Sequence, residues 1–99
     1  MHEQGMAKDL WPQLRAIADN NGFTRVTYIE MVVGLLHGVS GDALTHGLEH
    51  AFQETNFHGA DVEVTIVAPG EEFDAPGRND TQTASGWELL IVKMQGEKR

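Results

Sequence analysis

The chain has 99 residues, of which 40% are hydrophobic, no cysteine and a formal net charge of −8. Its length and apolar content predict one folded domain over residues 1–99, and the lack of cysteine excludes disulfides and thiolate metal sites. The acidic balance argues against nucleic acid as a partner, and without a visible signal peptide or membrane-spanning apolar run we expect a cytoplasmic protein that has no membrane partner.

The first predicted element is a helix. Apolar residues recur with the helical period from Met6 to Ala18, and residues 20–22 can take the positive φ that ends a helix. Pro12 falls inside this stretch, where its ring would clash with the carbonyl four residues earlier in a continuous helix. Either Asp9 caps a helix that starts near Leu10, or the helix kinks at Pro12.

The middle of the chain predicts a strand, a helix and a second strand. Residues 24–34 are rich in β-branched and aromatic side chains, as is typical of a strand. A loop over residues 34–41 follows, and Ser40 or Asp42 can cap the next helix. That helix carries one apolar stripe: Leu44, Leu48, Ala51, Phe52 and Thr55. Residues 60–69 then alternate between apolar and polar, which predicts a half-buried strand.

The last third predicts a long connection and a final strand. Residues 70–86 have the Gly, Pro, Asn and Asp content of an irregular loop, and Trp87–Met94 has the content of a strand. The order α-β-α-β-β predicts a single α+β domain, a three-stranded mixed sheet packed with two helices. We expect the first two strands to be parallel, because a helix connects them, and the last two to form an antiparallel pair.

The charge is unevenly distributed. No Lys or Arg lies between Arg25 and Arg78, whereas acidic residues recur throughout that span. They are Glu30, Asp42, Glu49, Glu54, Asp61, Glu63, Glu71, Glu72 and Asp74. One interpretation is a solvated surface that keeps the protein soluble, and the other is a docking face for a basic partner or a region that attracts divalent cations.

His46 to His50 spell H-x-x-E-H, a motif in which two histidines hold zinc and the glutamate activates water. On a helical wheel His46 and His50 fall opposite the apolar stripe, on the expected solvent face. A zinc hydrolase would need this pair in a pocket that excludes water, with a third ligand. We therefore favour exposed histidines without a function, the alternatives being a secondary metal site or zinc-dependent hydrolysis at His46, Glu49 and His50, and we do not expect an enzyme.

The N-terminus offers a chelate. The Met1 amine, the His2 amide nitrogen and the His2 imidazole can close two rings on one metal ion, and Glu3 adds an amide nitrogen or a carboxylate oxygen. Nitrogen donors of this kind favour square-planar Ni(II) or Cu(II). Taken alone, a polar tail explains these residues better, because any chain that begins Met-His has them.

The rest of the sequence favours a metal site at the N-terminus over a polar tail. The opening "MHE", followed by "RVTYIEMVVGLLHGVSGDAL", "TNFHGADVEVTIVAP" and "SGWELLIVKM", resembles the HypA/HybF family of hydrogenase nickel-incorporation proteins. The resemblance implies a nickel metallochaperone for a [NiFe] hydrogenase, or in some organisms for urease, with His2 as the principal Ni(II) ligand beside Met1 and Glu3. It also implies two partners, a GTPase accessory protein and the hydrogenase large subunit. We expect a monomer or a weak dimer.

The chain departs from this family at several positions. Relatives carry a zinc knob with two cysteine pairs between the last two strands, whereas here residues 70–85 stand in that place without cysteine, so no structural zinc is expected. Some relatives carry an aspartate near the second helix that is proposed to approach nickel; Ser40 stands there in this chain, and Asp42 is the additional candidate. Leu35 stands where relatives often have glutamate. The alternative function is a non-catalytic interaction or adaptor module that kept the fold without metal delivery.

Overall fold

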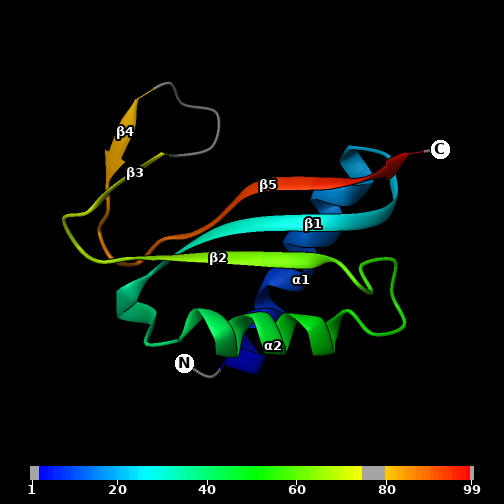
Figure 1. Cartoon of the computed structure of the whole chain (residues 1–99), viewed down its shortest axis with the longest axis horizontal. Helices are drawn as coiled ribbons and strands as arrows, with labels where there is room; N and C mark the ends of the chain where they lie inside the picture. Colours follow the sequence, from blue (N-terminus) through cyan, green and yellow to red (C-terminus); the bar gives the residue numbers. More distant parts are fainter. Residues whose placement is uncertain (1–2, 75–79, 99) are drawn as a thin grey trace.

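The structure is a computed structural model that describes residues 3–74 and 80–98, with side chains from residue 5 onward. The elements follow one another as α1 (Glu3–Asn20), β1 (Phe23–Gly34), the short 3-10 helix η1 (Leu35–His37), α2 (Gly41–Ala51), β2 (Asp61–Val67), β3 (Glu72–Asp74), β4 (Thr81–Thr83) and β5 (Leu89–Lys98) (Figure 1). Within these described ranges, no helix combines the length and the apolar content that crossing a membrane requires.

The main sheet has three strands in the order β2-β1-β5. Strand β1 pairs in parallel with β2, from Tyr28 beside Asp61 to Gly34 beside Val67, and antiparallel with β5. The predicted α+β domain with a mixed sheet and two helices is therefore confirmed, as is the parallel pairing across α2. The predicted pairing of the last two strands is wrong. Strand β1 lies at the centre of the sheet because β2 pairs with one of its edges and β5 pairs with the other.

The connection between β2 and β5 is more ordered than the sequence predicted. Strands β3 and β4 form an antiparallel hairpin in which Glu72 faces Thr83 and Asp74 faces Thr81. The hairpin stays against the sheet because it completes a small second apolar cluster. The members of this cluster are Val32, Val67, Ala84, Phe73, Leu90 and Val92. Hydrophobic contact therefore holds this segment in place.

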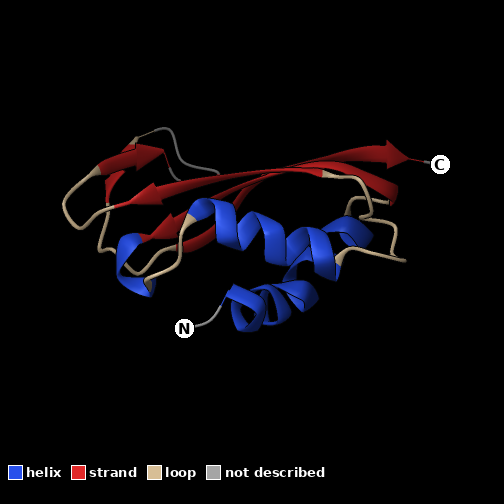
Figure 2. Cartoon of the chain, turned by 60° about the horizontal axis from the view of Figure 1, so that its bottom comes forward, coloured by secondary structure: helices blue, strands red, loops and turns tan. Residues whose placement is uncertain are grey.

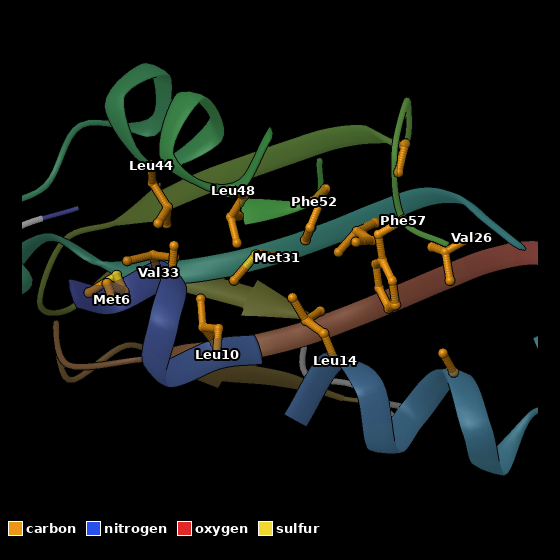
Figure 3. Close-up of a cluster of buried hydrophobic side chains, with 14 of the residues drawn as sticks. Met6, Leu10, Leu14, Val26, Met31, Val33, Leu44, Leu48, Phe52 and Phe57 are labelled. Atoms are coloured by element: carbon orange, nitrogen blue, oxygen red, sulfur yellow. The ribbon is translucent and has the colours of Figure 1, made fainter. Parts of the chain in front are cut away.

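Both helices cover the face of the main sheet that lies opposite the second apolar cluster (Figure 2). Their apolar stripes meet the inner face of β1 in one core, and Figure 3 shows its main members. These fully buried side chains are Met6, Leu10, Leu14, Met31, Val33, Leu44, Leu48 and Phe52. This packing is the main source of helix stability, since helices in proteins are stabilised mostly by the tertiary packing of an amphipathic face.

Helix α1 runs as one element through Pro12. A start near Leu10 is therefore wrong, because Met6 and Ala7 are already helical and buried in the core. Pro12 lies on the exposed side of α1, where water can serve the carbonyl that loses its helical partner. Burial of the first two turns offsets the cost of a proline inside the helix.

Candidate functional site

The first turn of α1 lies at the end of the domain where β1 finishes and α2 begins. In the core, Met6 of α1 lies beside Val33 of β1 and near Leu44 of α2 (Figure 3). Figures 1 and 2 also place the start of α1 toward this end. The backbone of Glu3, the first residue of the helix, therefore lies here. Met1 and His2, as well as the side chain of Glu3, fall outside the described residues.

The connection from β1 to α2 forms one side of this end. After η1, Gly38 takes a left-handed conformation with φ 73°, and its amide donates to the carbonyl of Leu35 at 3.0 Å. The Ser40 hydroxyl then accepts from the amide of Ala43 at 3.0 Å, so Ser40 is the helix cap. Asp42, exposed in the first turn of α2, is left with its carboxylate in solvent, where the helix dipole favours negative charge.

A tight turn before β5 forms the other side. The Glu88 carboxylate accepts from the Ser85 amide at 2.8 Å, the Ser85 hydroxyl at 3.1 Å and the Gly86 amide at 2.9 Å. The Trp87 amide donates in turn to the Ser85 hydroxyl oxygen at 3.1 Å. Burial pushes the pKa of Glu88 upward, but the hydrogen bonds from the backbone and the hydroxyl outweigh it and hold that pKa below its ordinary value. Trp87 therefore lies in a turn, and its assignment to the last strand is wrong.

Replacing Glu88 with glutamine is expected to lower the melting temperature by several degrees at pH 7, since the charged hydrogen bonds of a part-exposed carboxylate contribute about 1 kcal/mol together. Because the folded pKa of Glu88 is lowered, this contribution is present above the unfolded pKa and is lost as pH falls through the folded pKa. Melting curves of both proteins from pH 7 to pH 3 should therefore converge in acid. Glu49→Gln, on the exposed side of α2, is the control, and a difference that stays constant with pH would contradict the account.

The H-x-x-E-H motif lies elsewhere, along the outer side of α2. His46 and His50 are exposed, as the helical wheel predicted. With Glu49, His58 and Asp61 they border an open cavity of about 510 Å³. Over residues 3–74 and 80–98, no three His, Asp or Glu side chains come together as a metal site. The third ligand of a zinc hydrolase is thus absent from the described part of the chain.

Glu30 of β1 and Glu63 of β2 both lie within hydrogen-bond distance of the Tyr28 hydroxyl. The Tyr28 hydroxyl lies 2.6 Å from a Glu63 oxygen and 2.9 Å from a Glu30 oxygen, so its single proton serves one carboxylate at a time. The hydrogen bond to Glu63, followed by that to Glu30, raises the pKa of Tyr28 above its ordinary value. The phenol stays protonated, and this face of the sheet has the character of a solvated acidic surface.

The chain is similar to known proteins in sequence and in fold. The family model described as "Hydrogenase/urease nickel incorporation, metallochaperone, hypA" matches residues 1–72. A comparison with curated proteins gives no match. Among solved structures, the chain is similar to the solution structure of the Ni metallochaperone HypA from Helicobacter pylori, with a TM-score of 0.67 and 14% identity over 100% of both chains. At this identity the structural likeness shows the fold alone.

Proposed function

The chain belongs to the HypA family of hydrogenase/urease nickel-incorporation metallochaperones, and from this premise we propose that it binds Ni(II) through Met1, His2 and Glu3 and delivers it to a [NiFe] hydrogenase or to urease. The family match, which includes all three of these residues, is the observation that carries the proposal. The role is transfer of a metal ion by ligand exchange in the cytoplasm and involves no catalysis. Its partners would be a GTPase accessory protein and the precursor of the enzyme large subunit.

The donor set fits the metal. An amine, an imidazole and deprotonated amide nitrogens are donors that square-planar Ni(II) accepts. Glu3 is the first residue of α1, and the first amides of a helix have no carbonyl partner inside it. The Glu3 amide can therefore bind the metal without the loss of a helical hydrogen bond. The deprotonated amides of His2 and Glu3 would also neutralise the charge of the ion. This weakens its electrostatic repulsion by the positive end of the helix dipole.

Asp42 is the additional carboxylate of the proposal. It is exposed in the first turn of α2, at the same end of the domain as Glu3. His46 and His50 are the secondary candidates, and they lie one and two turns farther along the helix. Ser40, which holds the position of the aspartate found in some relatives, is occupied as the helix cap.

The proposed function includes no structural zinc site. Tetrahedral structural zinc needs thiolate or imidazole ligands, and residues 70–85 contain neither. The β3–β4 hairpin is instead held through Phe73 of β3, which packs against the buried side chains of Val32, Val67 and Ala84. The chain would thus deliver nickel without the zinc knob of its relatives.

A complementation experiment tests this function. In a strain that lacks the gene, hydrogenase or urease activity should fall, and it should recover with the wild-type chain or with excess nickel salt. His2→Ala should restore about a tenth of the activity or less, because losing even an outer-shell partner of a metal ligand typically costs about tenfold or more, and His2 is proposed as a direct ligand. His58→Ala, which removes an exposed histidine outside the proposed and secondary donors, is the matched control and should restore activity fully. Full recovery with His2→Ala would instead favour the adaptor module, in which metal plays no part.

A further inference from the structure

Three large apolar side chains of the described residues are exposed: Leu35 by 50%, Leu36 by 46% and Trp87 by 60%. They lie at one corner, although they come from segments far apart in the sequence. The Leu36 amide donates to the Gly86 carbonyl at 2.9 Å, and the Gly34 amide donates to the Glu88 carbonyl at 2.7 Å. These bonds fix η1 against the turn that carries Trp87. We call Leu35, Leu36 and Trp87 the apolar corner.

Several contacts hold the backbone of the apolar corner in place. The His37 ring packs edge-on against the Trp87 ring, with 5.4 Å between the ring centroids. Its Nε2 atom lies 3.0 Å from the Trp87 carbonyl oxygen. Together with the Glu88 hydrogen bonds, these contacts fix the backbone on both sides of Trp87. A preformed, solvent-exposed tryptophan loses little entropy on binding, and such residues are typical anchors of protein interfaces.

The negative charge of the chain indicates which partner fits. From Gly34 to Val92 the sequence contains a single Lys or Arg, Arg78, among many acidic residues, and the whole chain has a net charge of −8. A second copy would bring the same charge and be repelled. A partner with Lys and Arg around an apolar pocket would be attracted and would cover both leucines and the tryptophan.

We propose that the apolar corner docks the GTPase accessory protein through an apolar pocket bordered by basic residues. This inference rests on the proposed function and adds the surface where the partner binds. The apolar corner follows directly on β1, at the end of the domain toward which the first turn of α1 lies (Figures 1 and 2). A partner seated there would be close to the start of α1, the helix that the proposed N-terminal donors precede, as ligand exchange requires.

The test is a titration of the full chain with the purified GTPase accessory protein of the same organism. The dissociation constant is measured by calorimetry at low and high salt, for wild type, Trp87→Ser, Leu35→Ser and the exposed α1 control Gln13→Ala. We expect both apolar-corner variants to bind about tenfold more weakly or worse, because truncated interface anchors dominate affinity. Salt should weaken wild-type binding, and Gln13→Ala should match wild type. The Trp87 emission should shift to shorter wavelength on binding in a Trp11→Phe background, which leaves Trp87 as the single tryptophan.

Three results would overturn the inference. They are no binding by the wild type, unchanged affinity in Trp87→Ser, or self-association that Trp87→Ser abolishes, which would show that a second copy covers the apolar corner. Ni(II) titration of the same proteins separates this inference from the proposed function. Wild type that binds the partner through Trp87 but fails to bind Ni(II) would refute metal delivery alone. Wild type that binds Ni(II) while Trp87 is irrelevant to the partner would refute the docking surface alone.

Discussion

Gly34→Ala is expected to lower the free energy of unfolding by about 3 kcal/mol or more. A Cβ atom at this position would fall on the carbonyl of Gly86 and against the amide of Trp87. These are backbone atoms, so no side chain can rotate to make room. Gly34 itself has φ −71° and ψ 141°, which any residue adopts, and the expected loss is therefore purely steric.

Urea unfolding of Gly34→Ala beside Gly5→Ala measures this effect. Gly5 is also a glycine, but a Cβ there meets nothing within 4 Å, and it lies inside α1. Gly5→Ala should thus be neutral or stabilise the protein by up to about 1 kcal/mol, since alanine favours helix. Because Gly34 keeps η1 against the turn of Trp87, Gly34→Ala should also weaken partner binding at the apolar corner. An unchanged unfolding midpoint would show that the two segments do not pack as described.

Phe57→Ala is expected to have the largest effect on stability, about 3–5 kcal/mol. Phe57 is 1% exposed and closes a cluster of three aromatic rings between the helices. Its ring centroid lies 5.0 Å from that of Trp11 and 5.1 Å from that of Phe52, in the tilted and edge-on arrangements that aromatic pairs prefer. The variant would lose the buried surface and leave a cavity.

Phe57→Leu is the matched variant for this prediction. It keeps most of the apolar volume but loses the ring contacts, so its cost should be about 1–2 kcal/mol. Thermal and urea unfolding of both variants gives the comparison. Equal costs for the two would mean that the ring contacts outweigh cavity formation, and a small cost for both would mean that Phe57 is not a core residue in solution.

The sequence predicted the elements that have a clear periodicity. Residues 61–67 alternate between exposed and half-buried as the pattern Val62, Val64 and Ile66 indicated, and β1 ends at Gly34 as predicted. The parallel pairing of these strands follows from the helix between them. Their local patterns are strong because one face of each strand is buried in the core.

Long-range pairing could not be predicted in the same way. Both β1 and β2 offered an edge to the last strand, and only the three-dimensional packing shows that β5 lies beside β1. Trp87 has the content of a strand residue, but the carboxylate of Glu88 ties residues 85–87 into a turn. Phe57 was missed because it lies outside any periodic stretch.

The candidate site was predicted in part. The exposure of His46 and His50 followed from the helical wheel, and the Ser40 cap was one of two alternatives. The metal ligands Met1, His2 and Glu3 stay a prediction, since their side chains are outside the described residues. The apolar corner was missed, because the contact between Leu36 and Gly86 joins segments about fifty residues apart.

The most direct measurement is a Ni(II) titration of protein with its native N-terminus beside His2→Ala, followed by calorimetry and by d–d absorption. Metal delivery from the N-terminus predicts one tight, square-planar equivalent that releases protons on binding and is lost in His2→Ala. Identical isotherms and spectra for the two proteins would contradict it, and would leave partner binding as the function of the domain.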